Sequence, residues 1–183
     1  MDRRTIYTKN VLKETLIELM KKNHISKISV KKICEIADVN RSTFYAHYKD
    51  VYDLLSQIEL DTIIAIKNLV FDKPEQDRIP YESLCILFEY AAQNSTMFEI
   101  LLSERSELAF RDELIIMVKQ LGLVENRIKT GNKKMASKYL QLYSINGTLS
   151  VLSEWLRTGR IESVEEIANI INSLNRDMNI NSL

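Results

Sequence analysis

Apolar residues recur at helical spacing along most of the chain, and this pattern predicts a series of long helices. Between residues 5 and 22 the apolar side chains fall three or four positions apart, at Ile6, Val11, Leu12, Leu16, Leu19 and Met20. No segment shows the alternation of a half-buried strand. Prolines occur only at 74 and 80, and glycines only at 122, 131, 147 and 159, so few positions interrupt a helix. The chain is therefore predicted to be all-α.

A short helix is predicted to begin after the interruption "NHISKI". Ser29 is a suitable N-cap, and Ile28 before it is placed to meet Ile33 as a hydrophobic staple. The buried face of this helix is predicted to consist of Val30, Ile33, Cys34 and Ala37.

A three-residue turn, Asp38-Val39-Asn40, separates this helix from the next. Asn40 is a good N-cap, and Val39 with Phe44 forms a second predicted staple. The following helix is predicted to run from about Arg41 to Tyr48. The whole segment 30–48 therefore has the layout of a helix-turn-helix.

The later helices are predicted at about 50–71, 81–93, 95–103, 106–129, 133–158 and 163–174, which gives about nine helices in all. "DKPEQDRIP" is the clearest loop, with both prolines in it. Gly159 suits the position just after a helix, and Ser163 with Glu166 forms a capping box for the last helix.

The second helix of a helix-turn-helix lies in the DNA major groove with its N-terminal residues toward the base edges. Phe44 and Tyr48 are one turn apart and are predicted to pack inward. Arg reads guanine edges well, whereas hydroxyl groups and His suit phosphate oxygens. Helix N-termini add backbone donors for phosphate. The predicted DNA-binding residues are Ser29, Lys31, Asn40, Arg41, Ser42, Thr43, Tyr45, His47 and Lys49.

Several of these residues also have an ordinary structural explanation. Arg41 is close enough in sequence to pair with Asp38, and the ring of Tyr45 can lie along its own helix. His47 fits a solvated position, and Lys31 with Lys32 fits a solvated helix face.

The formal net charge of zero conceals an uneven distribution. Residues 1–50 hold 11 Lys and Arg against 6 Asp and Glu, a net of 11 − 6 = +5. Residues 51–183 hold 14 against 19, a net of 14 − 19 = −5. This asymmetry favours a basic module that meets a polyanion, attached to an acidic module that does not. We therefore predict a DNA-binding domain at residues 1–49 and a larger helical domain at residues 50–183.

Other classes of protein find little support in the sequence. No apolar run approaches a membrane span, and the N-terminus lacks the apolar segment of a signal peptide. Cys34 and Cys85 suit packing positions in a reducing cytoplasm. There is no Gly-rich phosphate loop, no H-E-x-x-H motif and no clustered metal ligands. We expect neither enzymatic activity nor a metal or cofactor.

The segment "SVKKICEIADVNRSTFYAHYKDVYDLL" resembles the DNA-binding region of the TetR (tetracycline-repressor-like) regulators. The resemblance covers about residues 5–56 and rests on Ser29, Ile36-Ala37, Thr43-Phe44-Tyr45, His47-Tyr48 and Leu54-Leu55. It implies that Thr43, Tyr45 and His47 contact phosphates or bases, and that Arg41 and Ser42 occupy the variable base-reading positions.

Two positions depart from the family pattern. The family usually has Gly where this chain has Asp38, which implies a left-handed backbone that Asp tolerates better than most residues. The family often carries Lys where this chain has Val51. Lys49, two positions earlier, is then expected to supply that phosphate contact.

The segment "SINGTLSVLSEWLRTGRIESVEEIANII" resembles the last two helices of a TetR subgroup common in low-GC Gram-positive bacteria. The resemblance implies a homodimer whose two final helices pair with those of the second copy, on a palindromic operator. The predicted interface residues are Tyr143, Gly147, Leu149, Leu152, Leu156, Ile167, Ile170 and Ile171. The alternative is that these faces close the core of a single chain.

The sequence does not identify the molecule that would regulate DNA binding. A pocket in the acidic domain is one possibility, with Phe88, Met97, Phe98, Phe110 and Met117 as candidate lining residues, although such residues are usually core. The main expectation is a repressor released by an effector of unknown identity. The alternative is a co-activator that depends on a partner protein and binds no small molecule.

Overall fold

The computed structural model describes residues 3–72, 80–103, 109–120 and 133–177. These residues contain nine α-helices, one short 3-10 helix and no strand, which confirms the all-α prediction. The α-helices are α1 (Arg3–Met20), α2 (Val30–Ala37), α3 (Arg41–Tyr45), α4 (Val51–Val70), α5 (Pro80–Gln93), α6 (Ser95–Leu101), α7 (Ala109–Gln120), α8 (Lys133–Arg157) and α9 (Val164–Asp177). The 3-10 helix spans Ile25–Lys27, between α1 and α2.

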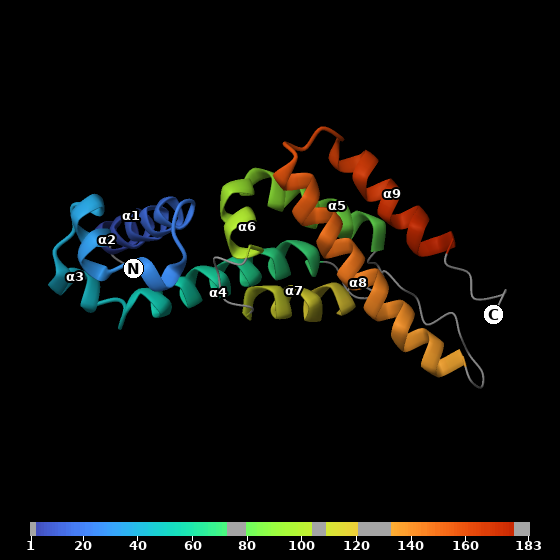
Figure 1. Ribbon diagram of the computed structural model, residues 1–183, viewed down its shortest axis with the longest axis horizontal. Coiled ribbons are helices and arrows are strands. Elements are labelled where there is room, and N and C mark those ends of the chain that lie inside the picture. The colour runs from blue at the N-terminus through green and yellow to red at the C-terminus, as the bar shows by residue number, and fades with distance from the viewer. Residues whose placement is uncertain (1–2, 73–79, 104–108, 121–132, 178–183) are drawn as a thin grey trace.

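The molecule is elongated, with α1, α2 and α3 at one end (Figure 1). Helix α4 starts beside α3 and runs away from that end toward α5 and α7. Helix α6 lies nearest to α1, while α8 and α9 occupy the other end. Helix α4 is therefore the element that extends from the first three helices into the rest of the fold.

The first three helices close around fully buried apolar side chains. Leu12 and Leu16 of α1, Ile33 of α2, Phe44 of α3 and Leu54 of α4 have no exposed surface. Each comes from a different turn or helix, so the small N-terminal unit depends on α4 for part of its core. Burying one such side chain stabilises a fold by about 1.5–3 kcal/mol.

The reversal between α8 and α9 follows the chemistry that the sequence predicted. Gly159 has a φ of 90°, and the N–H groups of Gly159 and Arg160 donate to the carbonyls of Leu156 and Trp155. This is the Schellman pattern, which requires a left-handed residue after the helix. Ser163 and Glu166 then form the predicted reciprocal capping box, with bonds of 2.8 and 3.2 Å.

Some predicted helix ends differ from those observed. The helix predicted at 106–129 is observed as α7 over Ala109–Gln120, and residues 121–132 lie outside the described part of the chain. Most of the predicted loop "DKPEQDRIP" also lies outside it. Within the described ranges, no helix is both long enough and apolar enough to cross a membrane.

Tyr48 combines burial with an unsatisfied hydroxyl. Its side chain is 3% exposed, and its Oη has no hydrogen-bond partner among the described residues. Burial, with smaller contributions from the charges of Asp61 and Asp53, raises the pKa of Tyr48 to about 12. The neutral ring is therefore the form that this core accepts.

Replacing Tyr48 with Phe is expected to raise the free energy of unfolding by about 1 kcal/mol, because it removes a buried hydroxyl that lacks a partner. Urea unfolding at neutral pH measures the change. The pKa of Tyr48 is higher in the folded state than in the unfolded chain. The parent should therefore lose stability relative to Tyr48→Phe as the pH rises from about 10 toward 12.

Tyr45→Phe is the matched control, because the Tyr45 side chain is 58% exposed. It should leave the unfolding free energy unchanged. A clear loss of stability in Tyr48→Phe would mean that the hydroxyl has a partner in solution.

Candidate nucleic-acid interface

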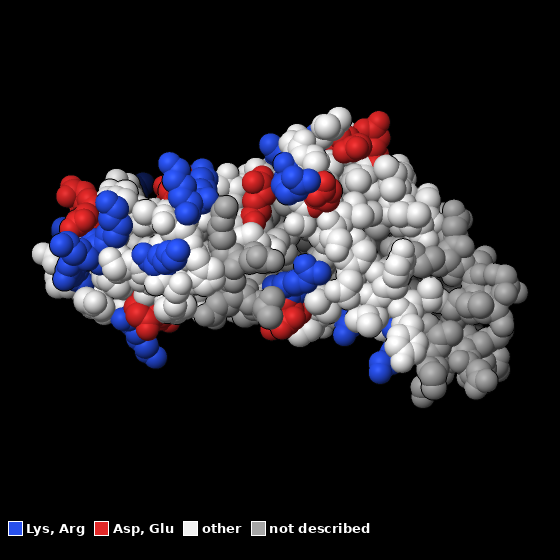
Figure 2. Space-filling view, in the orientation of Figure 1, with Lys and Arg blue, Asp and Glu red and all other residues white. Residues whose placement is uncertain are grey.

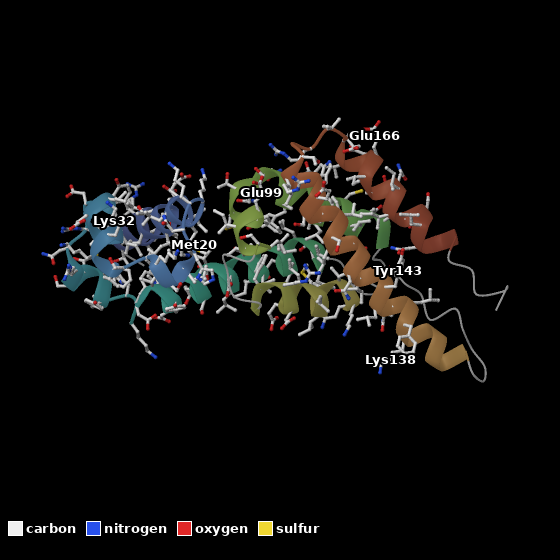
Figure 3. The ribbon with its side chains drawn as sticks, viewed as in Figure 1. Met20, Lys32, Glu99, Lys138, Tyr143 and Glu166 are labelled. Atoms are coloured by element: carbon white, nitrogen blue, oxygen red, sulfur yellow. The ribbon has the colours of Figure 1, made fainter. Side chains whose placement is uncertain are left out.

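The start of α2 is fixed by its cap. Ser29 has an extended backbone, and its Oγ accepts a hydrogen bond of 3.2 Å from the N–H of Lys32. Ile28 and Ile33 are buried beneath this cap, as a staple requires. The cap leaves Lys31 and Lys32 exposed on α2, where Figure 3 labels Lys32.

The two lysines of α2 differ in their partners. Lys31 Nζ lies 3.8 Å from the carboxylate of Glu35, one helical turn away. Lys32 forms no ion pair with any residue that the structure describes. Lys32 is thus the better placed of the two for an external anion, although Lys31 was the predicted contact. The signal that distinguishes them is Glu35, four positions after Lys31.

The turn between α2 and α3 has the geometry that its sequence predicts. Asp38 lies in the left-handed region, with φ 52° and ψ 44°. The N–H groups of Asp38 and Val39 both donate to the carbonyl of Cys34, which ends α2. Asp is one of the few non-glycine residues that adopt this conformation readily.

Helix α3 begins at a second cap. The Oδ1 of Asn40 accepts hydrogen bonds from the backbone N–H of Ser42 at 3.0 Å and from its hydroxyl at 3.1 Å. Phe44 is completely buried below the helix, while Arg41, Ser42 and Tyr45 are exposed above it. The sequence therefore directs one apolar side chain inward and a polar set outward.

The prediction that this helix continues to Tyr48 is wrong. Helix α3 ends at Tyr45, and the N–H groups of His47 and Tyr48 both donate to the carbonyl of Phe44. This tightened turn brings the Tyr48 ring into the core, 5.7 Å from the ring of Phe44. Local periodicity does not reveal where such a turn begins, because an inward-facing Tyr48 is expected whether the helix continues or ends at Tyr45.

The shorter helix changes the position of Lys49. Its backbone N–H donates to Asp53 Oδ2 at 2.8 Å, and Asp53 N–H donates to Asp50 Oδ1 at 2.9 Å. Lys49 is exposed and belongs to the entry into α4, beyond the end of α3. Two carboxylates and the buried Val51 occupy the start of α4, where the family often has a Lys.

The predicted DNA-binding residues lie together at one end of the molecule. Ser29, Lys31, Asn40, Arg41, Ser42, Tyr45 and Lys49 are exposed, whereas Thr43 and His47 are half-buried. Figure 2 shows Lys and Arg side chains spread over this end, with some Asp and Glu among them. The Tyr45 ring meets the edge of Phe44 at 5.6 Å between centroids, which holds the exposed ring in place.

Arg41 has no ion-pair partner among the described residues, so the pairing with Asp38 is not observed. Its guanidinium is near enough to Cys34 to affect the thiol. Burial raises the pKa of Cys34, and the charge of Arg41 partly opposes that rise. Arg41, the first residue of α3, is thus an exposed cation without an ion-pair partner in the described part of the chain.

The candidate ligand-lining residues are mostly core. Phe88, Phe98, Phe110 and Met117 have no exposed surface, and the rings of Phe98 and Phe110 meet edge to face at 5.7 Å. A ligand among these four side chains would have to displace them. Met97 differs, because it is only partly buried and borders a surface cleft. Cys34 and Cys85 are unbridged, and no cluster within the described ranges suits a metal ion.

The predicted interface residues divide into two groups. Five of them are buried within the single chain, which leaves little of their surface for a partner: Leu149, Leu152, Leu156, Ile167 and Ile171. Tyr143 and Ile170 are 65% and 48% exposed, and Gly147 is half-buried. The periodicity located the helix faces but not which of them the neighbouring helices cover.

Comparison with known proteins agrees with this geometry. Residues 80–177 match the family model of the TetR "Transcriptional regulator C-terminal region". No curated protein matches the chain. The match covers more than half of the 183 residues, and the chain belongs to the TetR family of transcriptional regulators, which are not enzymes.

Solved structures share the fold across nearly the whole chain. A TetR transcriptional regulator from Streptococcus agalactiae is 26% identical, with a TM-score of 0.69 and coverage of 95% of this chain and 96% of that one. The dihydroxyacetone kinase operon activator DhaS is 20% identical, with a TM-score of 0.61 and coverage of 94% and 96%. NalD, the secondary repressor of a multidrug efflux pump in Pseudomonas aeruginosa, is also 20% identical, with a TM-score of 0.62 and coverage of 94% and 96%.

Asn40→Ala is expected to lower the free energy of unfolding by about 1 kcal/mol, because the Ser42 N–H loses its acceptor. Urea unfolding measures the loss. Asn40→Asp retains an acceptor oxygen and should remain close to the parent. Equal stability of Asn40→Ala and the parent would show that this cap does not hold α3 in place.

Proposed function

We propose that the protein is a sequence-specific DNA-binding repressor that binds a palindromic operator as a homodimer and is released by an effector. The observation that carries this proposal is Arg41, exposed and unpaired within the described residues at the first position of α3. Recognition helices direct their N-terminal residues at base edges, and Arg pairs well with guanine.

The surrounding exposed groups suit the DNA backbone. Hydroxyl, amide and ammonium groups near α2 and α3 are typical phosphate ligands, which position a protein without reading sequence. We assign this role to Ser29, Lys31, Lys32, Asn40, Thr43, Tyr45, His47 and Lys49, and we keep Ser42 with Arg41 at the base-reading positions. The net charge of 11 − 6 = +5 over residues 1–50 supports binding to a polyanion.

A second copy of the chain is the proposed partner of α8 and α9. Tyr143 of α8 and Ile170 and Leu174 of α9 are large apolar side chains that the chain itself leaves exposed. A Cβ added at Gly147 would meet nothing within 4 Å, so the single chain gives no reason for glycine there. A mid-helix Gly costs about 1 kcal/mol relative to Ala. Close approach of a second α8 would explain its presence.

Helix α4 is the proposed route between residues 1–49, which read DNA, and residues 50–183, which dimerise and respond. It is unbroken from Val51 to Val70 and spans about 30 Å at 1.5 Å per residue. A displacement at its far end would move α3 of each copy and change their separation. The effector must bind one arrangement better than the other, since equal affinity shifts nothing.

Repression is proposed because occupation of an operator is enough to block transcription. The names of DhaS and NalD describe an activator and a repressor, so the shared fold accommodates both outcomes. The partner-dependent co-activator is therefore the competing proposal. Transcription measured from an operator-bearing template, with and without the protein, separates the two.

Arg41→Ala is expected to weaken binding to the best duplex by about 1–3 kcal/mol and to broaden base preference, because a base contact is lost. The duplex is selected from a randomised pool with the parent protein, and gel shifts measure affinity. Arg157→Ala is the control, since this exposed Arg pairs with Glu154 on α8. Unchanged affinity and preference in Arg41→Ala would refute the groove assignment.

The double variant Tyr143→Glu, Ile170→Glu is expected to be monomeric, because it places carboxylates on the proposed interface. Sedimentation velocity measures the mass, and circular dichroism checks the helix content. Ile161→Glu is the control, because Ile161 is 82% exposed between α8 and α9. An intact dimer in the double variant would rule out this placement of the interface.

A further inference from the structure

A cleft of about 760 Å³ lies where the first three helices meet the rest of the fold. Its walls come from α1, α4, the end of α5 and the start of α6. Helices α1 and α6 are in contact and lie side by side above α4 (Figure 1). The volume is in the range of small-molecule sites, which occur preferentially between domains.

The cleft has an apolar lining on one side. Ile17 of α1 and Ile58 of α4 are buried, and Tyr90 and Met97 add an aromatic ring and a thioether. Thr62 fixes the position of Met97, since its hydroxyl donates to Ile58 O at 2.7 Å and lies 3.4 Å from Met97 Sδ. This part of the cleft suits the apolar portion of a ligand.

The charged groups of the lining are mainly acidic. Glu14, Glu18 and Asp61 oppose a single Lys13, a net of 1 − 3 = −2. The ammonium of Lys13 is already engaged by Asp61, which also accepts from Gln57 at 2.7 Å. Burial raises the pKa of Asp61, but the hydrogen bonds from Lys13 and Gln57 outweigh it and hold the pKa below its ordinary value. Asp61 is therefore ionised at neutral pH.

Glu14 is the carboxylate that remains available. Glu18 pairs at 2.5 Å with Lys21, a residue that is not part of the cleft lining. Glu14 has no hydrogen bond or ion pair within the described ranges. The amides of Asn10 and Gln93 are also without partners there. Lys9 also acts on the charge of Asp61, so Glu14 is the lining carboxylate that has no ion pair within the described ranges. A cation is therefore favoured over an anion in this cleft, and a neutral apolar molecule would leave these polar groups unmatched.

We propose that this cleft binds a small organic cation, with its ammonium group near Glu14 and its apolar part against Ile17, Tyr90 and Met97. Aromatic faces attract such cations, which adds to the carboxylate interaction. A ligand there would contact α1 of the DNA-reading part and α6 of the remainder at the same time. The effect of this ligand on operator binding rests on the proposed function, whereas binding of the ligand to the cleft does not.

Three probes that share one apolar part test the charge requirement: 2-phenylethylamine, 2-phenylethanol and 3-phenylpropanoate. Calorimetry on the full chain without DNA is expected to show saturable binding of the amine, with the alcohol and the carboxylate about tenfold weaker or worse. Equal binding of all three, or no binding of the amine at millimolar concentration, would overturn the inference.

Variants locate the binding. Glu14→Gln should weaken binding of the amine about three- to fivefold, as expected for an exposed charge pair. Thr96→Trp places a large side chain on the α6 wall of the cleft and should abolish binding of the amine. Glu99→Gln is the control, since this exposed carboxylate lies on α6 outside the cleft lining (Figure 3). Parent-like binding in folded Glu14→Gln and Thr96→Trp would place the amine elsewhere and refute the site.

Gel shifts with the selected duplex then separate the two proposals. If the amine binds and lowers the parent's affinity for DNA, both are supported. If the amine binds the cleft but leaves DNA affinity unchanged, the binding site stands and release by this ligand fails. If the parent binds no amine but still binds the duplex through Arg41, the site fails and DNA recognition stands.

Discussion

The apolar stripe of α4 is the constraint on which the rest of the structure depends. Near its start, Leu54 and Leu55 complete the core of the first three helices. Near its end, Ile66 and Val70 are buried where α5 and α7 pack on the same helix. Neither part has its full core without α4, since one helix supplies apolar surface to both. A movement of α5 or α7 that tilted α4 would therefore also change the orientation of α3.

The proposed DNA-reading surface is held in place by the same core, because α3 packs directly on it. Phe44 and Tyr48 anchor α3 from below, and the left-handed Asp38 and the Asn40 cap set where it starts. With only five residues, α3 gains little stability from its own hydrogen bonds, because short helices are marginal alone. The position of α3 therefore depends on packing, and the buried Phe44 and Tyr48 support the exposed Arg41 and Tyr45.

The surface of α2 and α3 and the cleft at the junction have different charges, which suit the two different partners proposed for them. The outer surface of α2 and α3 presents Lys32 and Arg41 without ion-pair partners in the described part of the chain, as a polyanion requires. The cleft at the junction instead leaves Glu14 uncommitted, with Asp61 neutralised by Lys13. A cation drawn to the cleft and DNA drawn to α3 would not compete for the same groups. Any coupling between them would have to pass through α1 and α4.

The sequence alone determined the helices, their caps and the polar face of α3, because these follow from neighbours three or four residues apart. Ser29, Asn40, Gly159 and the Ser163–Glu166 box act locally, and each has the predicted geometry. Only the tertiary structure decided which apolar faces are covered. It buried Leu149 and Leu152 inside the chain while leaving Tyr143 exposed, and it ended α3 at Tyr45, before the predicted end at Tyr48. It also formed the cleft, whose walls come from helices distant in sequence. Periodicity identifies a face, but only packing selects its partner.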